Sequence, residues 1–402
     1  MSTPTVACPA SPAVHPRQSL QPYAGSVARH RIPTRGDRFA ALDGLRGLAI
    51  AVVMIFHVGF SWARGGSIGV DVFFVLSGFL ITLLLLQEWN KNHRISLVRF
   101  YARRALRLYP ALLLLLSAVL IYSWVAAHPV GIRPISVVIL GPLLYITDLQ
   151  GASGHIPGLT LTEHTWSLAI EEQFYLLWPP LLVLLLACGA KLRHLLGIAL
   201  GLTAASAVLT TMLWSGPESL NRLYIGPDTR AQALLLGCAL ALTTSAGWLP
   251  SKRWLNALLQ MIGLAAAAFL VAYTIGGSFR DAWNYTEYGL LLVALAAAAV
   301  IAAAIANPSG PIARVLALPP LVALGRISYG LYLWHWPIFL VLNSAYLGTS
   351  FLETQIIRFT VTVVVTLLSY WLVEQPFLRL RHRFRPQARI SGPVPGAHLT
   401  LT

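Results

Sequence analysis

Charged residues are scarce in this sequence. Only 11% of its 402 residues are Asp, Glu, Lys or Arg, whereas 56% are hydrophobic and the mean hydropathy is +0.68. Because soluble domains contain about 25% charged residues, this composition excludes an ordinary soluble protein of this length. The sequence instead predicts a polytopic membrane protein.

Acidic residues are especially few. The 14 Asp and Glu stand against 29 Lys and Arg, which gives a formal net charge of +15. Such a charge can indicate a nucleic-acid partner. Here, however, the basic residues gather in short segments between apolar runs, as they do in the cytoplasmic loops of membrane proteins. We therefore expect the lipid bilayer, and no nucleic acid, as a partner.

Cysteine is nearly absent. The three cysteines, Cys8, Cys188 and Cys238, lie in unrelated segments without a Cys-x-x-Cys spacing or a His-rich neighbour. This pattern supports neither a disulfide framework nor a zinc site. We expect no metal site in the chain.

Long apolar runs are what the sequence has in abundance. We predict an all-α fold, a polytopic integral membrane bundle of about ten transmembrane helices that forms one domain over residues 39–380. Disordered, basic, cytoplasmic tails are expected at residues 1–38 and 381–402. The expected spans lie near residues 41–61, 68–89, 106–124, 165–188, 194–214, 229–247, 254–275, 286–306, 321–343 and 354–375.

One apolar segment, residues 134–147, is short for a crossing. It holds about fourteen residues, including Gly141 and Pro142, where a membrane-spanning helix needs about 20. If it crossed, the basic cluster at Lys191 would lie outside the cell, against the positive-inside rule. We interpret it as re-entrant or interfacial, which places both termini in the cytoplasm.

The first apolar run carries two ionisable residues, both costly inside hydrocarbon. Arg46 lies near one end and His57 near the other, eleven residues apart. At about 100° per residue they share one helix face, roughly 16 Å apart. A neutral imidazole in a partly dry site can act as a general base. Alternatively, Arg46 extends to the headgroups and His57 hydrogen-bonds a neighbouring helix.

A basic cluster opens the third span. Arg103, Arg104 and Arg107 are three or four residues apart, so their guanidinium groups are neighbours on a helix. Such a group suits phosphate binding. Ordinary positive-inside charge is an equally good explanation.

Acidic residues also occur inside apolar spans. Glu171 and Glu172 lie one turn after Ser167, and must face the bundle interior or a cation. They are candidates for catalysis and substrate binding, and a structural ion pair with an arginine is the alternative. Asp71, in the second span, either orients His57 or caps a helix end.

The motif GRISYGLYLWHWPIF adds Tyr332 and His335 as candidate substrate contacts. Aromatic anchoring at the membrane interface explains its Trp334 and Trp336. A lone helix histidine is more often a packing residue than a catalyst, so that alternative stays open for His335. Elsewhere, Asp228 and Arg230 open another span, and we expect them to pair with one another.

Six motifs, spread in order over residues 40–380, resemble the acyltransferase 3 family of multi-pass membrane enzymes. They are LDGLRGLAI with a histidine eleven residues after its arginine, GVDVFFVLSGFLIT, RRALRLYP, HTWSLAIEEQFYLLWP, GRISYGLYLWHWP and VEQPF. The resemblance implies transfer of an acyl group, usually acetyl, from acyl-coenzyme A to a hydroxyl of a carbohydrate, glycolipid or glycosylated small molecule.

The resemblance also assigns residues. His57 corresponds to the proposed catalytic histidine of the family and Arg46 to its motif partner. Arg104 and Arg107 correspond to a pair thought to engage the coenzyme A phosphates. Glu171 corresponds to the acidic residue of the family's WSLxxE motif. No bound cofactor is expected, because acyl-coenzyme A is the donor substrate.

The sequence predicts the acceptor molecule and the cellular location less specifically than it predicts the reaction. Family members that modify cell-wall sugars often carry a further C-terminal hydrolase-like domain, and none follows the last span here. This favours polysaccharides, lipid-linked sugars or glycosylated antibiotics such as macrolides as acceptors. The expected location is the plasma membrane of a bacterium. A glycolipid transporter or flippase is the competing interpretation, since it too would have many spans and intramembrane charges.

Overall fold

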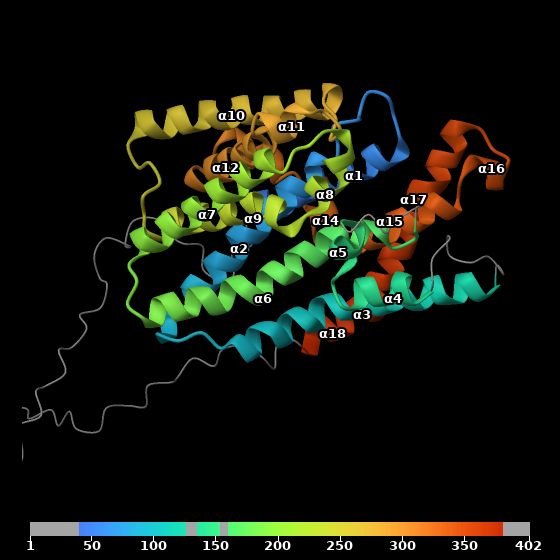
Figure 1. Ribbon diagram of the computed structural model, residues 1–402, viewed down its shortest axis with the longest axis horizontal. Coiled ribbons are helices and arrows are strands. Elements are labelled where there is room, and N and C mark those ends of the chain that lie inside the picture. Colours follow the sequence, from blue (N-terminus) through green and yellow to red (C-terminus); the bar gives the residue numbers. More distant parts are fainter. Residues whose placement is uncertain (1–39, 126–134, 153–159, 381–402) are drawn as a thin grey trace, which may run out of the picture.

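The computed structural model describes residues 40–125, 135–152 and 160–380, and these residues contain helices and no strand (Figure 1). The prediction of an all-helical polytopic membrane protein is confirmed. Both predicted tails lie outside the described residues. Eight helices are long and apolar enough to cross a membrane: α1 (Ala40–Val58), α2 (Ile68–Asn92), α3 (Leu97–Val125), α6 (Trp166–Ala187) with the preceding turn η1 (Glu163–Thr165), α7 (Leu192–Met212), α10 (Arg253–Gly276), α12 (Gly289–Ala306) and α17 (Phe351–Ser369), which continues through η3 (Tyr370–Glu374) into α18 (Gln375–Leu380).

Two of the ten expected spans take another form. The helix α9 (Pro227–Ser245) is nineteen residues long but is not among the eight apolar helices, because its first turns carry polar residues. The apolar run near 321–343 is divided at Ile327 into α14 (Pro319–Arg326) and α15 (Ser328–Val341). Length and composition therefore support eight crossings without establishing ten.

The short apolar segment after α3 forms α4 (Ile135–Leu143), which has nine residues. Nine residues span about 14 Å, less than half of the hydrocarbon thickness. A tight turn then leads into α5 (Thr147–Ala152). This geometry agrees with the interpretation of the segment as re-entrant or interfacial.

The segments that connect the long helices lie at two ends of the bundle. The C-terminal end of α2, the connection from α6 to α7 and the connection from α9 to α10 lie together at the left of Figure 1 and hold Lys91, Lys191 and Lys252. We call this side the basic end. The opposite end holds the C-terminus of α1 and the short elements η2 (Pro217–Ser219), α8 (Leu220–Ile225), α11 (Trp283–Thr286) and α16 (Ser344–Leu347). One further short helix, α13 (Pro311–Leu316), follows α12.

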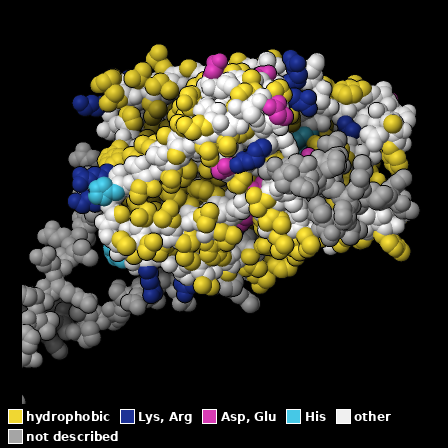
Figure 2. All heavy atoms as spheres, in the orientation of Figure 1, with side chains coloured by type: hydrophobic (Ala, Val, Ile, Leu, Met, Phe, Trp, Pro, Cys, Tyr) yellow, Lys and Arg dark blue, Asp and Glu magenta, His cyan; other side chains and the backbone are white. Residues whose placement is uncertain are grey.

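The flank of the bundle is apolar, as contact with lipid requires. On the face drawn in Figure 2, hydrophobic side chains cover most of the surface, and Lys and Arg lie mainly at its margins. On α6, for example, Leu176, Leu177 and Leu184 are exposed.

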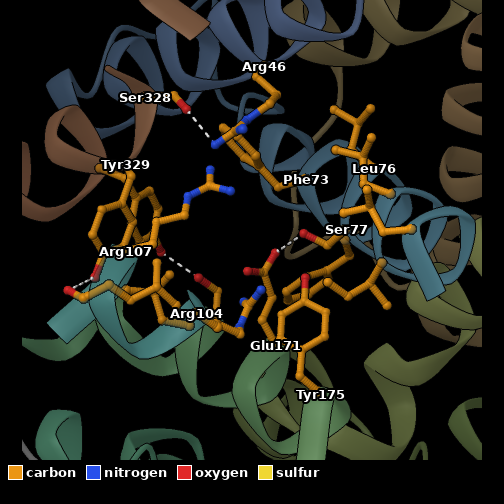
Figure 3. A pocket seen from close by; sticks show the side chains of 18 of the residues that line it. Arg46, Phe73, Leu76, Ser77, Arg104, Arg107, Glu171, Tyr175, Ser328 and Tyr329 are labelled. Atoms are coloured by element: carbon orange, nitrogen blue, oxygen red, sulfur yellow. Dashed lines mark hydrogen bonds between the residues drawn. The ribbon is translucent and has the colours of Figure 1, made fainter. Parts of the chain in front are cut away.

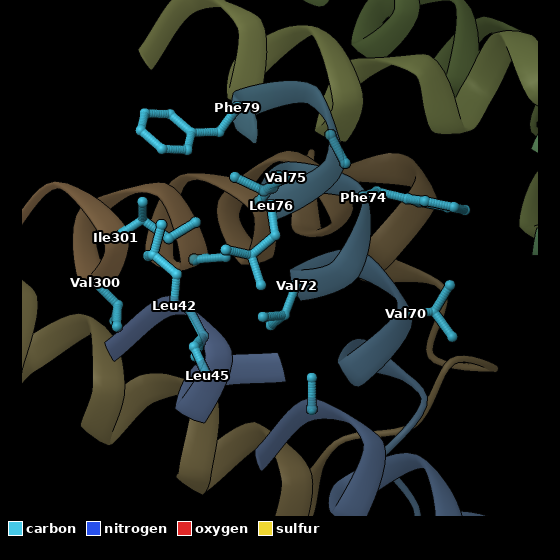
Figure 4. Packing of buried hydrophobic residues seen from close by; sticks show 14 of the residues in the cluster. Leu42, Leu45, Val70, Val72, Phe74, Val75, Leu76, Phe79, Val300 and Ile301 are labelled. Carbon is cyan, nitrogen blue, oxygen red and sulfur yellow. The ribbon is translucent and has the colours of Figure 1, made fainter. Parts of the chain in front are cut away.

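Close helix contacts hold the centre of the bundle together. Leu42 and Leu45 of α1, Val72 and Leu76 of α2 and Val300 and Ile301 of α12 belong to one buried cluster (Figure 4). On its other side α2 packs on α9 through two glycines. A Cβ atom added at Gly78 would collide with the carbonyl of Leu234, and one at Gly237 with the carbonyl of Val75. Small residues thus allow backbone contact at this crossing.

Candidate active site

A cavity of about 350 Å³ lies between α1, α2, α3, α6 and α15. Along α2 its lining extends from Val70 to Gln87, which corresponds to about 25 Å of helix. The cavity is therefore elongated, with one end toward the basic end of the bundle. Its wall is mostly apolar, and its polar lining residues are Arg46, Ser77, Gln87, Arg104, Arg107, Ser167, Glu171, Ser328, Tyr329, Tyr332 and Tyr175.

Two arginines point into this cavity. Figure 3 shows Arg46 entering from α1 and Arg107 from α3. Arg46 Nη2 donates to Ser328 Oγ at 3.1 Å. Within the described ranges, no carboxylate lies within 4.0 Å of either guanidinium. Two cations that face one cavity, and that form no direct ion pair within the described ranges, are a site suited to phosphate.

The three arginines of the basic cluster do not act as one group. Arg103 forms an ion pair with Glu88 on α2 at 3.5 Å. Arg104 Nε donates to both carboxylate oxygens of Glu172, at 2.7 and 2.9 Å. Arg103 and Arg104 are therefore each paired with an acid, on α2 and on α6 respectively. Arg107 faces the cavity and forms no ion pair among the described residues.

Arg104 is held on two sides, because its guanidinium also lies 3.4 Å from the ring centroid of Tyr175. Glu172 accordingly forms the structural ion pair that was the alternative to a role in substrate binding. The neighbouring Glu171 faces the cavity instead, where it accepts a hydrogen bond of 2.6 Å from Ser77 Oγ (Figure 3).

Ser167 and Tyr332 meet at the cavity wall. The Tyr332 hydroxyl donates to the carbonyl of His164 at 2.6 Å. Its single proton is then used, so Ser167 Oγ donates to the Tyr332 oxygen, also at 2.6 Å. Both residues line the cavity, and their roles as substrate contacts stay predictions.

His57 lies beyond Tyr332 and is oriented by His335. His335 Nδ1 lies 2.7 Å from the carbonyl of Tyr332, which can only accept, so this nitrogen carries the proton. His335 Nε2 is then an acceptor, and His57 Nδ1 donates to it at 3.1 Å. The network therefore leaves His57 Nε2 without a proton, as a general base requires. The helix face shared by Arg46 and His57 is directed at α15, which supplies the partners of both.

Other rings enclose the two histidines. Trp336 lies 4.8 Å from His57 between ring centroids and donates from Nε1 to the carbonyl of Thr160. Interfacial anchoring is thus an incomplete explanation of Trp336. The buried His164, which the sequence analysis did not single out, lies 5.6 Å from His335. In the part of the chain that is described, no group of three or more His, Cys, Asp or Glu is arranged to hold a metal ion.

Asp71 does not contact His57. It forms a buried ion pair with Arg230 on α9, with 2.8 Å between Oδ1 and Nη2. The prediction that Asp228 pairs with Arg230 is also wrong, because Asp228 binds Arg222 at 2.6 Å. The physical reason is the packing of α2 against α9, since residues two apart on a helix point in different directions.

The structure therefore brings most of the predicted site residues together. Arg46, Arg104, Arg107, Ser167, Glu171 and Tyr332 line one cavity, and His57 and His335 lie beyond its Tyr332 wall. Arg103, Glu172 and Asp71 are not in the lining. Sequence reasoning missed Tyr175 and His164, although His164 begins the motif HTWSLAIEE.

Fold and site together define a multi-pass helical membrane protein in which a cavity lined by arginines lies beside the pair His57 and His335. A family model described as an acyltransferase domain matches residues 39–374. The chain therefore belongs to the acyltransferase 3 family, which confirms the resemblance of the six motifs.

Two bacterial relatives are similar over most of the chain. The peptidoglycan O-acetyltransferase OatA of Listeria monocytogenes is 37% identical over 351 residues, covering 84% of this chain and 55% of the relative. The O-acetyltransferase OatA of Staphylococcus aureus is 34% identical over 348 residues, covering 83% of this chain and 56% of the relative. The chain thus spans about half the length of these relatives. No solved structure matches it.

Proposed function

We propose that the chain transfers an acetyl group from acetyl-coenzyme A to a hydroxyl of a glycan. The observation that carries this proposal is the elongated cavity with Arg46 and Arg107 in it and His57 beyond its Tyr332 wall. An acyl transfer from a phosphorylated carrier to an alcohol needs an anion site and a base. Family membership and the names of both relatives support the same reaction.

In this proposal the donor occupies the elongated cavity. Its phosphates contact Arg46 and Arg107, and its thioester arm lies along the apolar wall of α2 toward Tyr332. The arm must cover roughly 16 Å, the axial separation of Arg46 and His57 on α1. An apolar wall suits a flexible, uncharged arm because it excludes water from the thioester.

The acceptor hydroxyl approaches His57. His57 Nε2 takes the hydroxyl proton, and the acceptor oxygen bonds to the thioester carbonyl carbon. The carbon–sulfur bond then breaks, and the leaving thiolate takes the proton from the imidazolium. The products are an ester and the free thiol of coenzyme A. His335 keeps Nδ1 of His57 protonated, so Nε2 starts the reaction as a base.

The acceptor class rests on the relatives. The Listeria relative is named for peptidoglycan, which favours a cell-wall glycan over the glycosylated antibiotics that the sequence also allowed. Neither relative is named as a transporter, so the transporter interpretation gains no support from them.

Label transfer from radioactive acetyl-coenzyme A tests the proposal. Membranes containing the chain are incubated with the label and a tetramer of N-acetylglucosamine, and ester-bound label is counted. We expect transfer by the native chain and by Arg99→Ala, since Arg99 is an exposed residue outside the cavity. His57→Ala should lose about 10²- to 10⁴-fold in rate, the usual contribution of a general base. Undiminished transfer by His57→Ala would refute the assignment of the base.

A further inference from the structure

A second cavity, of about 280 Å³, lies at the end opposite the basic end. The residues that line it come from the N-terminus of α5, from η1 and α6, from α8 and from the connection between α10 and α11. They are Thr147, Glu163, Trp166, Asn221, Tyr224, Ile225 and Phe279. Asn221 is exposed, so the cavity reaches the surface there. We call it the aromatic cavity.

Three of its side chains form a continuous aromatic wall. The ring centroids of Trp166 and Tyr224 lie 5.1 Å apart, and those of Tyr224 and Phe279 lie 4.8 Å apart. Aromatic faces carry negative charge density, which attracts the polarised C–H groups of a sugar ring. Glu163 and Asn221 add groups that can hydrogen-bond hydroxyls. Among the described residues, no Lys or Arg is in the lining, so the chemistry favours a neutral polyol over a phosphate.

The aromatic cavity lies close to the histidine base. Phe279 contacts Phe56 at 6.0 Å between centroids, and Phe56 contacts His57 at 5.0 Å. One ring therefore separates the wall of the aromatic cavity from the imidazole. A sugar unit against Phe279 is thus within reach of the residue that would deprotonate a neighbouring hydroxyl.

A shared wall divides the two cavities. Trp166 lines the aromatic cavity, Phe74 lines the elongated one, and their ring centroids are 6.4 Å apart. The guanidinium of Arg230 lies 5.7 Å from the Phe74 ring and 5.2 Å from the Tyr224 ring. Buried in this wall and paired with Asp71, it fixes both rings in place. Packed side chains therefore separate the two cavities at this wall.

We propose that the aromatic cavity binds a sugar unit of the acceptor, next to the unit whose hydroxyl meets His57. The inference rests on the proposed acetyl transfer to a glycan, because that function supplies the sugar. It adds the location of the acceptor subsite, which is separate from the donor cavity and on the side of the chain opposite the basic end.

Direct binding tests the inference without catalysis. A fluorescently labelled N-acetylglucosamine tetramer is titrated with the purified full-length chain in detergent, and anisotropy gives Kd. Phe279→Ala and Trp166→Ala should each raise Kd roughly tenfold, as loss of an aromatic contact does. Phe279→Tyr keeps the ring and should bind like the native chain. Tyr346→Ala, which removes an exposed aromatic ring at the same end, is the matched control.

Two further measurements distinguish the loss of a sugar contact from the loss of folding. Binding of acetyl-coenzyme A should be unchanged in Phe279→Ala, which shows that the variant is folded. Arg99→Ala, which changes an exposed residue outside both cavities, should bind the tetramer normally. Native-like tetramer binding by both alanine variants, or no binding by the native chain, would overturn the subsite. Native-like binding by both alanine variants leaves the donor-label experiment unaffected, so this result would overturn the subsite and not the acetyl transfer.

Discussion

At the scale of single residues, the central feature is the pair of histidines. His335 fixes the proton of His57 on Nδ1 and is itself fully buried. We predict that His335→Ala lowers kcat of acetyl transfer about 10²-fold while the KM for acetyl-coenzyme A stays unchanged, because the base loses its orientation and the donor site does not. Initial-rate kinetics in membranes measure both constants. His335→Gln, which retains an acceptor for His57 Nδ1, should recover part of kcat. A change confined to KM would contradict a positioning role.

The cavity arginine Arg107 gives a second prediction. Removing a cation that binds a phosphate costs about 1.5–3 kcal/mol, so Arg107→Ala should raise the KM for acetyl-coenzyme A roughly 10- to 100-fold. Arg103 pairs with Glu88 outside the lining, so Arg103→Ala is the control and should change KM much less. Equal effects of the two substitutions would show that general basic charge, and not the cavity, attracts the donor.

The buried pair of Asp71 and Arg230 gives a third prediction. Asp71→Asn leaves a buried guanidinium without its counter-charge, which costs about 3–5 kcal/mol. We expect a lower thermal midpoint in detergent. The double variant with Asp71→Asn and Arg230→Met should regain much of it, because the buried charge is gone. A single variant as stable as the native chain would contradict this account.

Residue-level prediction worked where one helix set the geometry. Arg46 and His57 face the same neighbour because α1 is a continuous helix. It failed where two distant helices had to meet. The partner of Asp71 is on α9, and nothing in the local sequence of either helix specifies that crossing. The ion pairs of Arg103 with an acid on α2 and of Arg104 with an acid on α6 could not be predicted for the same reason.

At the scale of helices, the backbone contact between α2 and α9 is open to test. Gly78→Ala forces a Cβ atom against the carbonyl of Leu234, and overpacking of this kind costs about 1–3 kcal/mol. We expect a lower midpoint of thermal unfolding. Gly201 on α7 has no neighbour within 4 Å of an added Cβ, so Gly201→Ala is the matched control and should not destabilise. Equal midpoints for the two variants would contradict the close crossing.

The burial of Asp148 where α5 meets α6 should make stability depend on pH. Asp148 is buried and accepts from Gln173 Nε2 at 2.9 and 3.1 Å, and burial raises the pKa of Asp148 from 3.8 to about 6. A folded-state pKa above the unfolded value favours the fold below pH 3.8, and this contribution is lost as pH rises through about 6.

The size of the pKa shift of Asp148 determines how much the free energy of unfolding changes with pH. From about pH 4 to pH 8, the free energy of unfolding should fall by about 2 kcal/mol through this group. Thermal midpoints in detergent at both pH values measure the change. Asp148→Asn should remove this part of the dependence, since the amide does not titrate. The same pH dependence in the variant would show that another group is responsible.

Apolar length predicted most helices well, and its errors have a common cause. The break at Ile327 lies inside a continuous apolar run, so hydropathy alone could not reveal it. The helix α9 buries its polar first turns against other helices, including α2, and such burial depends on partners that a single helix does not specify. Short α4 was recognised because its length alone argues against a crossing.

At the scale of the whole molecule, composition and motifs predicted a helical membrane enzyme of the acyltransferase 3 family, and the family match confirms it. They did not predict two cavities, because each is assembled from four or more segments that are distant in sequence. The elongated cavity extends toward the basic end, and the aromatic cavity and His57 lie toward the opposite end. The account therefore places donor and acceptor on different sides of the membrane.

Transfer across a sealed vesicle tests this claim most directly. The chain is reconstituted into liposomes, with labelled acetyl-coenzyme A and the N-acetylglucosamine tetramer placed on opposite sides or on the same side. Because both orientations of the chain occur, the comparison does not depend on how it inserts. We predict acetylated tetramer when donor and acceptor are on opposite sides and none when they share a side. Product formed only when both are on the same side would contradict the account.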